Sequence, residues 1–150
     1  MKIVRMRDLS RRQQERLQSG ETGYLAEQLV AEVYGLDHKP DEADWYDCVH
    51  PNSAAKTEVK STSVRIGEKY PARGRFRLRR DQTRSLLSSD ARGVAWYAFV
   101  LYDFEKGEIR IRRAKPSTVN AWVREAGGWN EAGHEEFEKQ RKASLQTVLN

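Results

Sequence analysis

The sequence predicts an α/β fold in which a mixed central β-sheet is flanked by helices. Apolar residues recur at helical spacing over residues 21–34, and a second helix-like segment follows at 81–89. Residues 94–102 form a near-continuous apolar run with the length of a buried central strand. Because helix-like and strand-like segments alternate, we expect a mixed sheet with a helical crossover.

The composition predicts one domain, spanning residues 1–150, that folds without disulfides. Apolar residues make up 38% of the chain and charged residues 33%, which argues against wholesale disorder. The formal net charge is +5, and the cations gather at residues 11–12, 73–84 and 110–115. Such a surface attracts polyanions, so nucleic acid is the expected partner. A solubilising charged face is the competing interpretation for 73–84.

Cysteine and histidine usage excludes several kinds of site. Cys48 is the single cysteine, so neither a disulfide partner nor a cysteine-rich zinc site is expected within the chain. His38, His50 and His134 lack metal-ligand spacing, and His50 is interpreted as a turn or surface residue. No apolar run approaches the ~20 residues of a membrane span, and the first residues lack a signal-peptide core. We therefore expect a cytoplasmic protein without a membrane partner.

The first elements are expected to be helices. Residues 8–18 are polar nearly all round and are interpreted as a helical N-terminal arm rather than a packed element. Gly20 separates this arm from the helix over 21–34, which Gly35 ends. The core is therefore expected to begin at about residue 20.

A hairpin is expected next. Residues 44–50 and 56–66 are predicted to be strands, and Pro51-Asn52-Ser53 forms the turn between them. So short a connection favours antiparallel pairing. In a suitable register, the acid at position 47 would lie beside the middle of the second strand.

The second of these strands carries the most informative motif of the chain, Glu58-Val59-Lys60. Side chains alternate along a strand, so Glu58 and Lys60 share one face while Val59 points into a core. With Asp47, two acids and a lysine would meet. Carboxylates bind magnesium, which can polarise a phosphodiester, and a lysine can orient or deprotonate the attacking water. The set indicates hydrolysis of a nucleic-acid backbone, although a lone Glu-x-Lys is usually a solvated ion pair.

The remaining elements are expected to complete the core and add a tail. Residues 67–74 are predicted to be a loop, and 108–113 alternate isoleucine with charge as a half-buried edge strand. Residues 115–149 are interpreted as a helical C-terminal appendage, with a helix to about Glu125 and a polar stretch with few core contacts over 134–149. Trp122 and Trp129 are expected to pack this appendage on the body.

Asp47 followed by Glu58-Val59-Lys60, with an acid on an earlier helix, resembles the PD-(D/E)xK nuclease superfamily, which includes restriction endonucleases and archaeal Holliday-junction resolvases. Tyr46 stands where the family name has proline. Residues 76–82 with Leu86-Leu87 are similar to the start of the helix that follows the ExK strand in many members. The resemblance covers about residues 20–102.

This resemblance implies a restriction endonuclease-like core over about residues 20–113 and a metal-dependent deoxyribonuclease, a magnesium-dependent endonuclease of resolvase-like, restriction or repair type. Mn²⁺ is the alternative to Mg²⁺. Asp47, Glu58 and the carbonyl of Val59 would hold the metal, and Lys60 would serve the water. A catalytically inactive DNA-binding module with the same fold is the alternative function.

The resemblance also implies a carboxylate on the first core helix. Glu27 follows Gly23 by four residues, a spacing similar to that in the resolvases, whereas the charge of Glu21 at the helix start has a structural explanation in the helix dipole. Glu27 is therefore the favoured catalytic residue, with Glu21 as its competitor.

DNA contacts and a homodimer complete the expectations. The backbone phosphates would be held by residues of the basic segment, namely Arg73, Arg75, Arg77, Arg79, Arg80 and Gln82. A single centre cuts one strand per encounter, so a two-fold homodimer is expected. The Ile109/Ile111 strand and the 122–129 segment are the expected contact surfaces.

Overall fold

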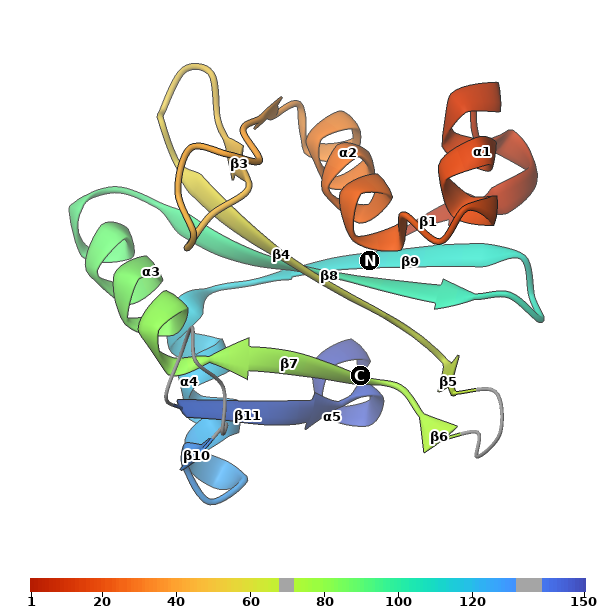
Figure 1. The fold of residues 1–150 in the computed structure, drawn as a ribbon. Helices are drawn as coiled ribbons and strands as arrows, with labels where there is room; N and C mark the ends of the chain where they lie inside the picture. The colour runs from red at the N-terminus through yellow and green to blue at the C-terminus, as the bar shows by residue number, and fades with distance from the viewer. Residues whose placement is uncertain (68–71, 132–138) are drawn as a thin grey trace.

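The computed structural model describes residues 1–67, 72–131 and 139–150 (Figure 1). A six-stranded mixed sheet lies at its centre. Its strands are, in chain order, β1 Lys2–Arg5, β2 Asp37–His38, β3 Cys48–Val49, β4 Lys56–Ser63, β8 Ala95–Asp103 and β9 Glu108–Ala114. Their spatial order is β1-β9-β8-β4-β3-β2, with β4 parallel to β8 and the other neighbours antiparallel. The predicted α/β class and mixed sheet are confirmed.

Helices cover one face of the central sheet, and helices together with a small three-stranded sheet cover the other (Figure 1). The helices are α1 Arg11–Gln18, α2 Thr22–Tyr34, α3 Arg80–Arg92, α4 Pro116–Glu125 and α5 Leu145–Leu149, with a 3-10 turn at Met6–Asp8. One core lies between α2 and the side of the sheet that carries Val59 and Ala98. A second core gathers Tyr97 and Phe99 of β8 with residues of α3 and α4. None of the described helices is long and apolar enough to cross a membrane.

The N-terminal segment is packed, which corrects its interpretation as an arm over 8–18. Ser10 caps α1 by accepting a hydrogen bond from the Gln13 N–H, and the Gln13 side chain accepts from the Ser10 N–H. Leu9 is buried, and Leu17 packs against the first core. Few apolar residues are enough here because α1 rests on α2 rather than on the sheet.

The strand at Glu108–Ala114 is not an edge strand, contrary to the sequence prediction. β1 pairs antiparallel along its outer side, with Lys2 opposite Ile111 and Arg5 opposite Glu108. Ile109 and Ile111 are fully buried, so the expected dimer contact through them is also wrong. The alternating pattern of β9 fits one buried face, but it carries no information about a partner strand from the other end of the chain.

The predicted hairpin is confirmed as the antiparallel pair β3–β4. Its first strand is shorter than residues 44–50, because only Cys48–Val49 is paired. The second strand ends at Ser63 rather than at Ile66. Beyond it, β5 Arg65–Ile66 pairs with β6 Ala72–Arg73 in a separate two-stranded sheet, which replaces part of the loop expected at 67–74; residues 68–71 lie outside the described part.

A third sheet, in the order β10-β11-β7, was not predicted. Its strands are β7 Arg75–Arg79, β10 Asn130–Glu131 and β11 Lys139–Ser144. Residues 76–79 are therefore strand, and the helix that resembles the family's begins at Arg80. Phe76 and Leu78 are fully buried while Arg75 and Arg77 are exposed, which is the alternation of a half-buried strand.

The C-terminal segment has the predicted helix α4 and a terminal helix α5, with β11 between them. The expectation of few core contacts over 134–149 is wrong for its described residues, because Ala143, Leu145 and Val148 are buried in the second core. Residues 134–138 lie outside the described ranges. Trp122 and Trp129 pack against the same core, as predicted.

Candidate active site

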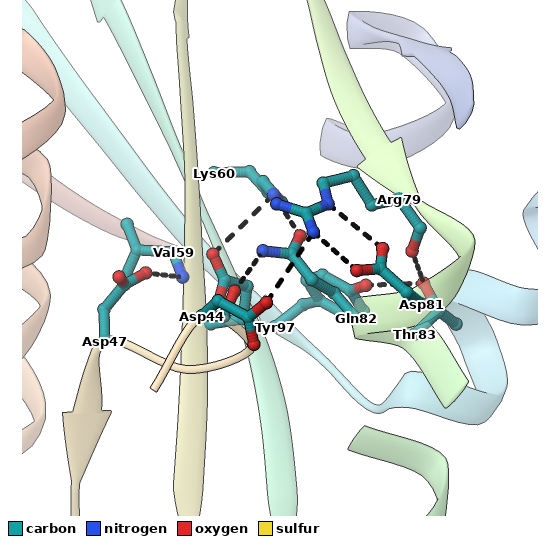
Figure 2. A network of polar contacts seen from close by, with 10 residues as sticks. Asp44, Asp47, Val59, Lys60, Arg79, Asp81, Gln82, Thr83 and Tyr97 are labelled. Atoms are coloured by element: carbon teal, nitrogen blue, oxygen red, sulfur yellow. Dashed lines mark hydrogen bonds and ion pairs between the residues drawn. The ribbon is translucent and has the colours of Figure 1, made fainter. Parts of the chain in front are cut away.

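The short length of β3 places Asp47 beside the Glu-Val-Lys motif. β3 pairs with β4 only as far as Thr57, so no strand among the described residues pairs with the next part of β4 on that side. The N–H of Asp47 donates to the Thr57 carbonyl at 2.9 Å, and its Oδ2 accepts the Val59 N–H at 2.8 Å (Figure 2). The N–H and C=O of one strand residue point to the same side. The Val59 carbonyl therefore faces the open edge with Asp47.

Glu58 and Lys60 lie on the α3 side of β4, as the alternation predicts. Lys60 Nζ is 3.6 Å from Glu58 Oε1. Glu58 is only 5% exposed, and its Oε2 accepts no hydrogen bond from the described residues. Burial raises the pKa of Glu58 well above its ordinary value; Lys60 opposes this, and the carboxylates of Asp47 and Glu27 add to it. A cation beside Glu58 Oε2 would offset both the cost of burying this carboxylate and its repulsion by Asp47 and Glu27.

These oxygens fit a hard divalent cation. Magnesium usually takes one or two carboxylates and keeps several waters. Asp47 and Glu58 supply the carboxylates, the Val59 carbonyl lies at the same strand edge as Asp47, and no described residue donates a hydrogen bond to Glu58 Oε2. No group of three His, Cys, Asp or Glu side chains suited to a metal occurs among the described residues. A metal here would therefore rely on two carboxylates, the main-chain oxygen and water.

A polar network ties the motif to the first turn of α3 (Figure 2). Gln82 is 4% exposed; its Oε1 accepts from Lys60 Nζ at 2.6 Å, and its Nε2 donates to the Asp44 carbonyl at 2.6 Å. Arg79 donates to Asp81 through Nε at 3.0 Å and lies 4.0 Å from the Asp44 carboxylate. Gln82 thus fixes both the lysine and the loop that carries Asp47.

The carboxylate on α2 that reaches the site is Glu27. Its Oε1 lies 2.9 Å from His38 Nε2, and burial and then the Asp47 charge raise its pKa, against the effect of His38. Glu21 stands at the N-cap of α2, 3.6 Å from Arg16 and with its side chain 56% exposed. The geometry favours Glu27. His38 was not predicted, because its partner on α2 is recognisable only once α2 and β2 are placed.

His50 and three arginines of the basic segment take no part in this polar network. His50 Nδ1 accepts the N–H groups of Asn52 and Ser53 in the turn, as predicted, and His134 lies outside the described residues. Arg73 on β6 and both Arg75 and Arg77 on β7 are exposed. The structure therefore divides the predicted DNA contacts into two groups: Arg73, Arg75 and Arg77 on the surface, and Arg79, Arg80 and Gln82 at the start of α3.

A family model for a PD-(D/E)XK nuclease superfamily domain matches residues 12–150. The chain belongs to the PD-(D/E)XK nuclease superfamily. Members of this superfamily are usually metal-dependent nucleases. The match extends from α1 through α5, so the family domain is wider than the core expected at about 20–113. No curated protein matches the chain in sequence.

Proposed function

We propose that this PD-(D/E)XK domain is a magnesium-dependent endonuclease that hydrolyses DNA phosphodiester bonds. The observation that carries the proposal is Glu58 Oε2, a buried oxygen without a donor among the described residues, on a carboxylate whose Oε1 lies 3.6 Å from Lys60 Nζ. Asp47, Glu58 and the Val59 carbonyl would hold the metal, with Mn²⁺ as a substitute. Bound there, the metal would polarise the phosphodiester and stabilise the leaving oxygen.

Lys60 would orient the attacking water and contact the scissile phosphate. Its Nζ has three donors, of which one is directed to Gln82 Oε1 and one faces Glu58 Oε1. The remaining donor is left for water or a phosphate oxygen. Glu27 would add negative charge behind Asp47, and its bond to His38 keeps its side chain in one orientation. Lys60 and Glu27 would together position the proton transfer to and from the water.

The exposed Arg73, Arg75 and Arg77 would hold the DNA backbone without reading its sequence. Replacing Arg75 and Arg77 by alanine should reduce the slope of log affinity against log salt by about 0.9 for each phosphate that the variant no longer neutralises. An unchanged slope would assign both side chains to a solubilising surface.

Cleavage assays on supercoiled plasmid, linear duplex, single-stranded and four-way-junction DNA test the activity. We expect cleavage with Mg²⁺ or Mn²⁺ and none with EDTA, and the preferred substrate distinguishes resolvase, restriction and repair types. A protein that shifts DNA on a gel but cuts none of the four substrates would support the alternative, an inactive DNA-binding module.

The active form of the enzyme would be a homodimer, because a duplex break requires two centres. The buried β9 offers no surface for it, and Trp122 and Trp129 already contact the second core. Light scattering with and without DNA is the direct measurement. A monomer in both conditions that makes double-strand breaks would refute the dimer and indicate sequential nicking.

A further inference from the structure

A groove of about 500 Å³ lies between the loop before Asp47 and the side of α3. A pocket of this volume is large enough for a drug-sized or nucleotide-sized ligand. It is lined by one aromatic side chain, two cations and three hydroxyls: Trp45, Arg84, Ser85, Ser88, Ser89 and Arg92. None of these residues belongs to the metal-binding set, yet the groove shares a loop with Asp47 and a helix with Gln82, which contacts Lys60.

Trp45 is held in a fixed position relative to the catalytic centre. The Asp44 carbonyl on one side of it accepts from Gln82, and Asp47 on the other side accepts from Val59. The Trp45 ring packs edge-on against the buried Tyr46, with the ring centroids 4.6 Å apart, and it is partly buried against the second core while also lining the groove. An aromatic side chain held in this way offers a preformed surface for stacking.

The α3 side of the groove is positively charged and polar. Ser85, Ser89 and Arg92 recur at spacings of four and three, so they share one helix face, and Arg84 and Arg92 are exposed. Within the described residues, neither arginine has an ion-pair partner. Serine is a weaker helix former than alanine, and three serines within five positions place hydroxyls along the groove.

We propose that this groove binds an unpaired nucleotide of the DNA substrate next to the cut. Its base would stack on Trp45, its phosphates would face Arg84 and Arg92, and the serine hydroxyls would donate to sugar or phosphate oxygens. A base inside a duplex is already stacked and paired, and extracting it costs free energy. The enzyme should therefore prefer DNA with a single-stranded end or gap to blunt duplex; this inference rests on the proposed nuclease function.

Affinity measurements in EDTA test the proposal without cleavage. The probes are a fluorescein-labelled blunt duplex, the same duplex with a single-stranded end, and that end built from abasic nucleotides, which keep the phosphates and lack the bases. Trp45→Ala should weaken binding to the single-stranded end about tenfold or more and leave the blunt duplex and the abasic end unchanged. Trp45→Phe should keep most of the affinity, because phenylalanine can still stack.

The two arginines have a separate readout. Arg84→Ala or Arg92→Ala should lower the salt slope on the single-stranded end by about 0.7, with the abasic end affected equally. Arg12→Ala is the matched control, because Arg12 is an exposed cation on α1 and α1 packs on α2, away from the groove.

The results separate failure of this inference from failure of the proposed function. A Trp45→Ala variant that keeps the wild-type ratio of affinities for the two ends, or that loses blunt-duplex affinity equally, overturns the groove while the nuclease proposal stands. Wild-type protein that neither binds nor cuts any of the DNA substrates overturns both. If Trp45→Ala lowers the thermal midpoint, Trp45→Phe is the deciding variant. Affinity for the single-stranded end that is kept in Trp45→Phe supports stacking on the ring, and affinity that is lost in a folded Trp45→Phe overturns it.

Discussion

The two faces of β4 differ in chemistry although they belong to one eight-residue strand. On the α2 face, Val59 packs with the apolar Ala98 and Val100. On the α3 face, Glu58 and Lys60 are enclosed by Gln82 and by Tyr97, whose hydroxyl is 2.6 Å from that of Thr83. One face supplies folding free energy, and the other holds polar groups whose burial opposes folding. The period-two alternation of a strand is what allows both within three residues.

Substitutions at neighbouring positions should separate these two contributions, and the largest effect is expected at the motif. Glu58→Gln or Lys60→Ala should reduce cleavage by at least about 100-fold. Glu58→Gln should leave the thermal midpoint unchanged or higher, because burial and the neighbouring carboxylates disfavour the ionised form of Glu58 by more than Lys60 favours it. Cleavage rates and thermal melts of the same preparations give both quantities.

Val59→Ala is the matched control for the opposite face. It should lower the free energy of unfolding by about 2 kcal/mol while preserving cleavage at temperatures where it is folded, since only the main chain of Val59 faces the site. The division between the faces would be contradicted if Glu58→Gln cleaved DNA at the wild-type rate. It would also be contradicted if folded Val59→Ala lost as much cleavage as Glu58→Gln.

The next largest effect is expected at Gly74, where the chain before β7 passes close to the end of β4. A Cβ at Gly74 would lie 1.8 Å from the Ser63 carbonyl oxygen and 2.8 Å from Thr62 Oγ1, and the Gly74 N–H donates to the Val64 carbonyl. Gly74→Ala must displace main chain, so it should destabilise the fold by about 1–3 kcal/mol. Gly93→Ala, where a Cβ meets nothing within 4 Å, should differ little from wild type. Equal melting curves for the two variants would refute the close approach.

These cases show which features the sequence could reveal. The Glu58-Val59-Lys60 alternation and the link to Asp47 depend on a short hairpin, so local pattern was sufficient. β7 and β11 pair segments more than sixty residues apart, with Phe76 opposite Ala143. A strand such as Lys139–Ser144 has one buried residue, Ala143, and so carries almost no periodic signal. Contacts such as Gln82 with Lys60 depend on how elements pack, which no spacing in the sequence encodes.

A smaller change in activity should distinguish the two acids of α2. Glu27→Gln should lower cleavage about tenfold, because the Glu27 charge acts on the centre through Asp47. The glutamine side chain can still bind His38, so the position of the side chain should be kept. Glu21→Gln should change cleavage less than twofold, since that side chain is mostly exposed beside Arg16. Single-turnover rates at saturating Mg²⁺ provide the comparison. A loss of activity in Glu21→Gln, with full activity in Glu27→Gln, would reverse the assignment.

The smallest effect concerns a polar pair on the α3 side that serves stability. Asp90, near the end of α3, binds the Lys115 ammonium and the Ala95 N–H. Burial opposes ionisation of Asp90, but Lys115 and the Ala95 N–H outweigh it and lower the pKa below its ordinary value. A lowered folded-state pKa contributes stability that is present above the unfolded-state pKa, near 4 for aspartate, and is lost as the pH falls through the folded-state value. The pair is partly solvated, so the contribution should be no more than about 1 kcal/mol.

Asp90→Asn should therefore melt slightly below wild type at pH 7, and the difference should shrink as the pH falls below about 4. A melting difference that stays constant from pH 7 to pH 3 would show that Asp90 acts by packing alone. A difference that disappears at low pH would show that the Asp90 charge stabilises the fold, on the same α3 side of the sheet that carries the charge of Glu58.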